Sequence, residues 1–336
     1  MTGLRPGTRA EDGMLTLYDF HESTFTAGRP LFVACGFFDG VHRGHQALLA
    51  QTRRLADDAG GRAAALSFSP HPLELLAPAQ APALLSPVNL RLKLLAENGM
   101  DGCILLNFDR AMSALPPAGF IDFLFGKFPN ICGLVSGTDW RFGCRQAGDA
   151  EILRTLAAER AFSLTVLPPV LHAGEKISSS RIRAELRAGN LDAAAAMLGR
   201  PFTVLGEVRP GRQIGRTLGV PTANLLPPGK NPLPPGSYAA RAVLDDGTAH
   251  PASAYAGSRP TYQDTESYYV ECHLLDGKHD LYGRELRVEF LRQIRPEMKF
   301  RSETELRERI HADLDAAREF FRINRQPMEE RTDGQK

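Results

Sequence analysis

The sequence predicts an α/β protein in which a domain with a parallel β-sheet is followed by a smaller antiparallel β-barrel and a C-terminal helix. Two observations lead to this prediction. Short apolar runs alternate with helical patterns over about the first 200 residues, whereas from residue 202 onward strands follow one another with turns between them. The 336 residues suffice for two domains that each bury a core.

The N-terminal strands and helices alternate regularly. Residues 31–34 read as a buried strand that runs into a glycine-rich turn, and a helix follows over 46–59. Further strands are expected over 63–68, 102–106, 132–135 and 163–166, with helical segments between several of them, for example 150–160. This alternation implies a parallel sheet covered on both faces, and ligands of such sheets bind at the carboxyl ends of the strands.

The C-terminal part has a different pattern. Residues 181–198 still read as two helices, but beyond them strands are expected over 238–244, 249–255, 268–275 and 286–291. The first two of these flank Asp245, Asp246 and Gly247, which is a hairpin signal. Short strands without intervening helices indicate a small antiparallel barrel.

A last helix is expected from Ser302, because Ser302 and Glu305 have the spacing of a capping box and apolar residues follow at helical intervals. We therefore predict a first domain over residues 14–200, a second domain over 201–323 and a disordered polar tail over 324–336.

Charge and hydropathy argue against several classes of function. The chain has 40 basic and 39 acidic residues, so its formal net charge of +1 gives no general attraction to nucleic acid or an anionic membrane. The N-terminus lacks the apolar core of a signal peptide, and no apolar run is long enough for a membrane span. We expect a soluble cytoplasmic protein with small-molecule substrates, and infer no obligatory protein partner.

The five cysteines indicate a reducing compartment. They include no CxxC pair, and most of them lie in apolar runs, so buried reduced thiols are expected. No His/Cys cluster has the sequence spacing of zinc ligands, so a zinc site is not predicted.

The strongest motif is GFFDGVHRGH at residues 36–45, between the first buried strand and the following helix. His42 and His45 lie three residues apart at the start of a helix, where both can face one phosphate and the helix dipole favours an anion. They would stabilise charge on the α-phosphate of ATP while an incoming phosphate displaces pyrophosphate. The alternative is that both histidines merely cap the helix.

A second cluster, ISSSRIR at residues 177–183, opens another helix after the last strand of the same domain. Hydroxyl groups followed by arginines suit a flexible clamp for a triphosphate. A helix start that is simply capped by serine gives the same pattern.

The barrel half contains a glycine-rich loop and a Pro-Thr-Ala-Asn segment. The glycines at 211, 215 and 219 allow backbone N–H groups to wrap phosphates, but they fit no Walker or Rossmann spacing and a plain loop explains them equally. Thr222 and Asn224 are two apart on an extended chain and therefore point the same way. Their oxygens are of the kind that Mg²⁺ accepts beside phosphate oxygens.

Glu271 stands between apolar neighbours in the expected strand 268–275. Its carboxylate either faces solvent on the polar side of the strand or acts as a positioned general base. Spacing alone favours the solvated face.

Together these motifs resemble those of the bacterial bifunctional riboflavin kinase/FMN adenylyltransferase (FAD synthetase) family. The resemblance extends from about residue 30 to residue 322. Besides the motifs above it rests on SFSPHP at 67–72, GTDWRFG at 137–143, DLYG at 280–283 and IRPEMKF at 294–300. It implies a Rossmann-like nucleotidyltransferase domain followed by a riboflavin kinase barrel. The implied activity uses ATP and Mg²⁺ to convert riboflavin to FMN, and then ATP to convert FMN to FAD.

The resemblance also implies the site residues. His42 and His45 are implied to act in adenylyl transfer, and Glu271 is implied to take the proton from the ribityl hydroxyl that attacks the γ-phosphate. The implied nucleotide contacts are Gly36, Asp39, Gly40, Gly44, Asp139, Ser179, Ser180 and Arg183 in the first domain and Gly211, Gly215 and Arg216 in the second. The implied flavin contacts are Pro72, Phe142 and Arg295, and the implied metal ligands are Thr222 and Asn224.

Some of these residues have plainer interpretations from the sequence alone. His71 and Phe142 then read as an ordinary loop histidine and a core aromatic residue, and Arg295 equally as part of an exposed salt bridge. The chain also departs from the family pattern: Phe37 and Tyr255 replace usual asparagines, and Pro210 stands where a histidine is common.

Three alternative functions remain open. One, which the departures support, is an enzyme in which only one half is active, and another is a flavin or nucleotide sensor without catalysis. The third is a first half that adenylylates a different phosphorylated acceptor.

Overall fold

The computed structural model describes residues 8–9, 14–20, 25, 28–210, 219–227, 230, 232–259, 267–277 and 279–324. The chain divides into two compact units. One contains the described residues up to Pro82 together with Val88–Ser179, and the other contains Ala83–Pro87 and the described residues from Ser180 onward. Gly211, Gly215, Arg216 and the predicted tail beyond Asn324 lie outside the described residues.

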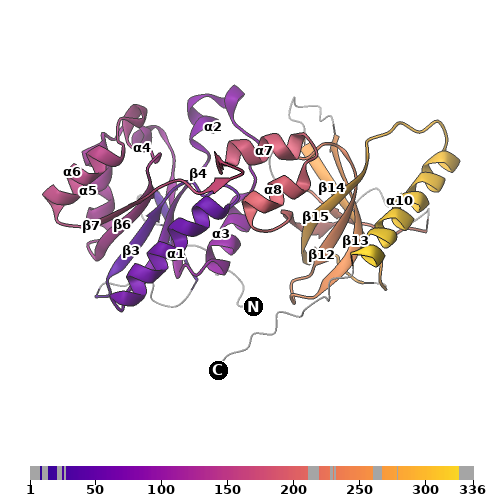
Figure 1. The fold of residues 1–336 in the computed structure, drawn as a ribbon, viewed down its shortest axis with the longest axis horizontal. Coiled ribbons are helices and arrows are strands. Elements are labelled where there is room, and N and C mark those ends of the chain that lie inside the picture. Colours follow the sequence, from indigo (N-terminus) through magenta and orange to yellow (C-terminus); the bar gives the residue numbers. More distant parts are fainter. Residues whose placement is uncertain are drawn as a thin grey trace. The chain divides into compact units, whose positions relative to one another are not determined.

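The N-terminal unit is a doubly wound α/β sheet with strand order β1-β2-β5-β4-β3-β6-β7 (Figure 1). Strands β3 to β7 are parallel, and β1 and β2 add an antiparallel edge. The elements are β1 (Thr8–Arg9), β2 (Leu15–Asp19), β3 (Leu31–Cys35), α1 (Arg43–Asp58), β4 (Arg62–Ser69), α2 (Pro72–Leu76), η1 (Pro78–Gln80), α3 (Val88–Glu97), β5 (Gly102–Asn107), α4 (Arg110–Ala114), α5 (Pro117–Lys127), β6 (Ile131–Gly137), η2 (Cys144–Gln146), α6 (Ala150–Arg160), β7 (Ser163–Leu167), β8 (Leu171–His172) and β9 (Glu175–Lys176).

The central strand β3 determines where this sheet can bind a ligand. Its neighbours are β4, the next strand in sequence, and β6, so the direction of winding reverses beside β3. In doubly wound sheets the crevice at such a reversal, beyond the carboxyl ends of the strands, is the usual ligand site. The motif at residues 36–45 begins directly after β3.

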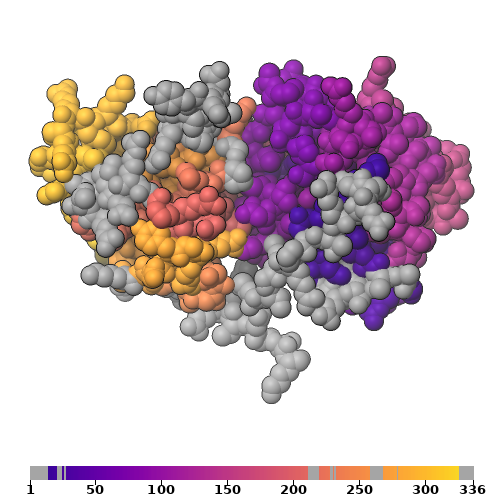
Figure 2. Space-filling model, turned by 180° about the vertical axis from the view of Figure 1, so that it is seen from behind, coloured from indigo at the N-terminus to yellow at the C-terminus, as the bar shows by residue number. Residues whose placement is uncertain are grey.

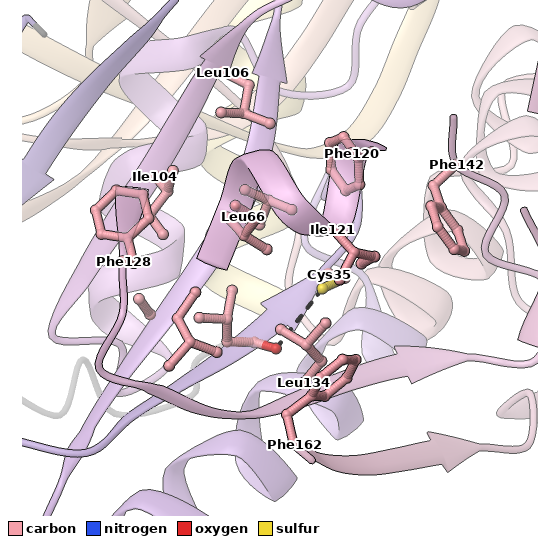
Figure 3. Packing of buried hydrophobic residues seen from close by; sticks show 14 of the residues in the cluster. Cys35, Leu66, Ile104, Leu106, Phe120, Ile121, Phe128, Leu134, Phe142 and Phe162 are labelled. Carbon is pink, nitrogen blue, oxygen red and sulfur yellow. Dashed lines mark hydrogen bonds between the residues drawn. The ribbon is translucent and has the colours of Figure 1, made fainter. Parts of the chain in front are cut away.

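The core of this unit lies on both faces of β3, since all five of its residues are buried. On one face Cys35, Leu66 and Leu134 pack against Phe120 and Ile121 of α5, as Figure 3 shows. Helix α1 packs against β3, β4 and β6 with a stripe of buried residues. Burying each large apolar side chain stabilises the fold by about 1.5–3 kcal/mol, which explains why an uninterrupted apolar run forms the central strand.

Strand β2 and the start of α1 differ from the sequence prediction. Strand β2 was not predicted; it pairs antiparallel with β5 at the edge of the parallel strands, where the sequence pattern gives little signal. Helix α1 begins at Arg43 rather than at residue 46, because the side chain of His42 caps it.

The second unit contains a closed antiparallel barrel with strand order β10-β11-β14-β13-β12-β15. The predicted fold class, a parallel α/β domain followed by an antiparallel barrel and a C-terminal helix, is therefore confirmed. The elements of this unit are α7 (Ser179–Arg187, from Ser180), α8 (Leu191–Leu198), β10 (Phe202–Arg209), β11 (Ala223–Leu225), β12 (Gly236–Val243), β13 (Ala249–Arg259), β14 (Ser267–Leu274), β15 (Glu285–Pro296) and α10 (Glu303–Ile323).

Alternation along β14 separates the inside of the barrel from the outside. Val270 and Cys272 are buried, whereas Tyr269, Glu271 and His273 between and beside them are partly exposed. Helix α8 packs against β10 and β15, and α10 packs against β12, β13 and β15. Much of α10 remains exposed on its outer side (Figure 2).

The start of α10 confirms the predicted cap at Ser302 but not the full capping box. The Ser302 hydroxyl accepts a hydrogen bond from the backbone N–H of Glu305 at 3.1 Å. The carboxylate of Glu305 accepts instead from the N–H of Arg301 at 2.7 Å, one residue before the cap.

A buried ion pair joins α10 to the barrel. Arg295 at the end of β15 and Asp313 of α10 have side chains only 8% and 7% exposed, and the guanidinium Nε lies 3.0 and 2.9 Å from the two carboxylate oxygens. Arg309 lies 3.3 Å from the same carboxylate. An exposed salt bridge was one of the two interpretations of Arg295 from the sequence. The salt bridge is present, but it is buried rather than exposed.

Replacing Asp313 with alanine should strongly destabilise the barrel unit. It leaves the buried Arg295 guanidinium without its carboxylate, which costs about 3–5 kcal/mol for pairs of this kind. Urea unfolding followed by circular dichroism measures the change. The matched control is Asp315→Ala on the same helix, whose ion pair with Arg318 is exposed and should contribute little. Equal effects of the two variants would contradict a structural role for the buried pair.

Candidate active sites

The turn between β3 and α1 has an unusual backbone. Phe38, Gly40 and Val41 have φ values of 59°, 80° and 41°. This left-handed region suits glycine but is strained for a β-branched residue such as valine. Phe38 and Val41 are both fully buried, so packing holds the strained conformation in place.

The turn brings the two motif histidines together. His42 is the N-cap of α1, and its Nδ1 accepts a hydrogen bond from the backbone N–H of His45 at 3.3 Å. The two imidazole rings are stacked with centroids 3.6 Å apart. A Cβ at Gly44 would lie 3.2 Å from the His42 ring, so the glycine in this motif makes room for the histidine before it. Capping of the helix and phosphate binding are therefore compatible roles for His42.

The environment of His45 favours its neutral form. Its Nδ1 is buried and has no hydrogen-bond partner among the described residues. Burial of the ring, followed by the charges of His42, Arg91 and Lys176, holds the pKa of His45 well below 6.5. The same positive surroundings are suited to a phosphate.

Arg91 of α3 supports this turn, and the sequence interpretation missed it. It is 1% exposed, and its Nη1 donates hydrogen bonds to the carbonyl oxygen of Phe37 at 2.8 Å and to the hydroxyl of Ser67 at 3.0 Å. Its guanidinium lies 4.4 Å from the centroid of the Phe37 ring. Burial lowers the pKa of Arg91. The only available signal was an arginine among the leucines of residues 90–95.

Two further predicted residues are Ser179, the first residue of α7, and Asp139. The hydroxyl of Ser179 donates to the carbonyl oxygen of Asp39 at 2.9 Å. Asp139 follows β6, is exposed, and forms an ion pair with Lys176. On β6 itself the hydroxyl of Ser136 is buried without a hydrogen-bond partner among the described residues.

The other residues of this domain that were predicted to contact nucleotide or flavin differ in how exposed they are. Ser180 is exposed, and Arg183 is buried with its Nε donating to the carbonyl oxygen of Ala83 at 2.7 Å. Pro72 opens α2, which is capped by His71. Phe142 is 5% exposed and belongs to the hydrophobic core, where its ring stacks on Trp140.

The barrel has a cavity of about 590 Å³ that contains the predicted metal ligands. Thr222 and Asn224 line it, as does Gly219, which has φ 80°. The amide nitrogen of Asn224 donates to the carbonyl oxygen of Thr222 at 3.3 Å, and within the part of the chain that the structure describes the amide oxygen is available to a ligand.

Strand pairing places the predicted base beside these ligands. Glu271 of β14 is directly opposite Asn224 of β11 on one side and Tyr255 of β13 on the other. Directly opposite residues project from the same face of a sheet, so the three side chains lie on the outer face of the barrel. Glu271 does not itself line the cavity.

Tyr255, which replaces an asparagine of the family pattern, has a partner of its own. Its hydroxyl donates to the carboxylate of Glu297 at 2.6 Å, and its ring lies near that of Tyr269. Burial and then the Glu297 carboxylate raise the pKa of Tyr255.

Two family models match the chain. The model described as FAD synthetase matches residues 25–181, and the model described as riboflavin kinase matches residues 198–321.

Curated relatives match nearly the whole chain. The bifunctional riboflavin kinase/FMN adenylyltransferase of Escherichia coli K12 is 38% identical over 292 residues, which cover 86% of this chain and 92% of the relative. Proteins of the same name are 37% identical in Pseudomonas fluorescens, covering 84% and 90%, and 32% identical in Listeria monocytogenes, covering 92% and 98%.

A solved structure is also similar. The crystal structure described as a macrolide-efflux protein from Streptococcus pneumoniae has a TM-score of 0.73 and 28% identity, and covers 89% of this chain and 97% of that chain. Among the described helices of the present chain, none is long and apolar enough to cross a membrane.

The lowered pKa of His45 should make the folded chain sensitive to acid. As the pH falls through 6.5, the unfolded chain takes up a proton on His45 but the folded chain does not. The free energy of unfolding should therefore decrease below pH 6.5, by at most about 1.4 kcal/mol per pH unit from this group, until the lower folded pKa is reached.

Denaturant unfolding at about pH 7.5 and about pH 5.5 measures this effect. The wild-type chain should lose more stability between these values than His45→Gln, which has no titrating imidazole at this position. The control His311→Gln removes an exposed histidine and should behave like the wild type. Equal losses in the wild type and His45→Gln would exclude the lowered pKa.

Proposed function

The chain belongs to the bifunctional riboflavin kinase/FMN adenylyltransferase family, and from this premise we propose which residues carry each of its two reactions. The protein phosphorylates riboflavin to FMN and adenylylates FMN to FAD, with ATP as the donor in both reactions.

Adenylyl transfer is assigned to the turn between β3 and α1. A phosphate oxygen of FMN attacks the α-phosphorus of ATP, and the bond to the oxygen of pyrophosphate breaks. His42 and His45 would stabilise the negative charge that builds up on the α-phosphate. The observation that carries this assignment is the stacked imidazole pair at the N-terminus of α1, where the winding of the sheet reverses.

The backbone and side chains around this pair would hold the rest of ATP. Gly36, Gly40 and Gly44 are the proposed main-chain contacts of the phosphates. The hydrogen bond from the Ser179 hydroxyl to the Asp39 carbonyl oxygen would hold the main chain of this turn in position. The remaining proposed nucleotide contacts of this half are Asp139, Ser180 and Arg183.

Phosphorylation of riboflavin is assigned to the barrel. Glu271 would take the proton from the terminal ribityl hydroxyl as its oxygen attacks the γ-phosphorus of ATP. Thr222 and Asn224 fit a Mg²⁺ ion, since both line the same cavity and carry a hydroxyl and an amide oxygen. When bound there, Mg²⁺ would neutralise charge on the ATP phosphates. Gly211, Gly215 and Arg216 remain proposed phosphate contacts.

The three residues proposed to contact flavin differ in how far their surroundings must move before a flavin ring can reach them. Pro72 is partly exposed at the start of α2 and is available to a flavin ring without rearrangement. Phe142 is buried in the core and Arg295 is held by Asp313, so these two would contact flavin only if their surroundings move.

We also retain the domain division at Arg200 as a proposal. The first family model ends at residue 181 and the second begins at residue 198, which supports a division of the chain in this region. Helix α8 packs against β10 and β15, which favours including it with the kinase barrel in any fragment. A cytoplasmic location is proposed because the five cysteines are unpaired.

Replacing His42 or His45 with alanine should separate the two activities. Each variant loses one contact to the reacting phosphate, so FAD formation from FMN should fall by about 10²- to 10³-fold while FMN formation from riboflavin continues. Purified protein is incubated with ATP, Mg²⁺ and either flavin, and the products are separated by chromatography. His172→Ala in the same unit is the control. A parallel loss of both activities in a folded variant would refute the two-site assignment.

Replacing Glu271 with glutamine should impair only the kinase. Glutamine preserves the size of the side chain but cannot take a proton, so FMN formation should fall by about 10²-fold or more. Adenylylation of supplied FMN should not change. Glu207→Gln, on the exposed side of β10, is the matched control. A near-normal kinase rate in Glu271→Gln would return this carboxylate to a solvated role.

A further inference from the structure

Three side chains of the barrel unit that neither proposed reaction uses lie close together. His250 of β13, Asp276 and His279 each offer a ligand atom, and these atoms all lie within 4.8 Å of one another. The two imidazole rings are 4.5 Å apart between centroids. His250 is partly buried, whereas Asp276 and His279 are exposed, so a solvated ion can reach the cluster.

The backbone of the barrel assembles this cluster. In the pairing of β13 with β14, Ala252 is opposite Leu274, and the hydrogen bond from the N–H of Leu275 to the carbonyl of Pro251 continues the ladder. The next pair in this register is His250 opposite Asp276. Gly277 then turns the chain with φ 75°, and the Nε2 of His279 lies 2.8 Å from the carbonyl oxygen of Asp276.

A chain of hydrogen-bonding groups leads outward from the Nε2 of His250. The hydroxyl of Thr248 donates to the carboxylate of Asp246 at 2.6 Å, so it can only accept from the Nε2 of His250 at 3.3 Å. A His250 ring that binds a cation through Nδ1 carries its proton on Nε2, which then donates to this hydroxyl. Such an outer hydrogen-bonded chain orients metal-binding histidines and fixes their tautomer.

The Nδ1 of His250 faces a carboxylate. It lies 3.2 and 3.1 Å from the two oxygens of Asp276, so the ring nitrogen and the carboxylate can share a cation, which is either a proton or a metal ion. His279 adds a third acceptor, because its Nε2 must donate to a carbonyl oxygen and its Nδ1 then has a free lone pair.

A proton can satisfy only part of this arrangement. A proton shared by His250 and Asp276 would join these two side chains, but the lone pair on the Nδ1 of His279 would then bind nothing in the cluster. A divalent cation can use both imidazoles and the carboxylate at once. Two imidazoles and one carboxylate select a borderline transition-metal ion such as Zn²⁺ over Mg²⁺, which requires oxygen ligands.

We propose that His250, Asp276 and His279 form a binding site for Zn²⁺ or a similar late first-row divalent ion, with solvent in the remaining position. The site is separate in chemistry from the oxygen ligands Thr222 and Asn224. His279 also lines the cavity that contains those two residues, so the bound ion would sit at the edge of that cavity. This site was not predicted from the sequence, since His250 and Asp276 are 26 residues apart and meet only through strand pairing.

The test is a zinc titration of the full-length chain after removal of metals by a chelator. Excess Mg²⁺ is present to fill oxygen sites, and a chromophoric chelator competes for Zn²⁺. The wild type should bind one equivalent, and His250→Ala, Asp276→Asn and His279→Ala should each weaken binding by at least about 10-fold. Thr248→Val, which removes only the outer hydrogen bond, should also weaken it. His311→Ala is the control for an exposed histidine elsewhere.

X-ray absorption of the zinc-loaded wild type gives a readout that does not depend on how the variants fold. Two imidazole ligands and an oxygen shell at about 2.0–2.2 Å are expected. Thiolate ligands, displacement of Zn²⁺ by Mg²⁺, or unchanged affinity in folded His250→Ala would each overturn the proposal.

Discussion

The turn between β3 and α1 is the constraint on which the N-terminal unit depends. Phe38 and Val41 adopt left-handed backbone conformations that cost about 1–3 kcal/mol each, while burial of each side chain returns about 1.5–3 kcal/mol. The two effects are of similar size, so the turn needs further support. Arg91 supplies it through the hydrogen bond to the Phe37 carbonyl. Strain, burial and the Arg91 hydrogen bond together fix where α1 begins. The start of α1 in turn fixes where the stacked histidines lie.

Register has the same importance in the barrel. Because side chains alternate along β14, a slip of one residue would bring Cys272 to the outer face and turn Glu271 inward. Pairing with β11 and β13 prevents the slip and sets Glu271 opposite Asn224. The same pairing of β13 with β14 also brings His250 to Asp276. One ladder of backbone hydrogen bonds thus positions both the proposed base and the proposed zinc site.

The sequence predicted most of the fold because apolar periodicity is a local signal. It could not predict features that arise from contacts between distant segments. In the sequence alone, Arg91 is an ordinary polar residue of an amphipathic helix, and only the packing of α3 against the turn shows its role. The residues of the His250 cluster are far apart in the sequence and form no motif. Arg295 illustrates a third limit: its charge was evident, but only the docking of α10 shows that its carboxylate partner is buried.

The departures from the family pattern bear on whether both halves remain active. Phe37 contributes its carbonyl oxygen, not its side chain, to the hydrogen bond from Arg91, and its ring adds contacts with that guanidinium and with His71. Replacing an amide side chain there leaves the main-chain support intact. Tyr255 stands next to Glu271, where a bulky side chain is the greater threat, but its hydroxyl is bonded to Glu297. Both substitutions are thus accommodated by specific partners, which is expected of a chain whose two sites are retained rather than of one that has lost either reaction.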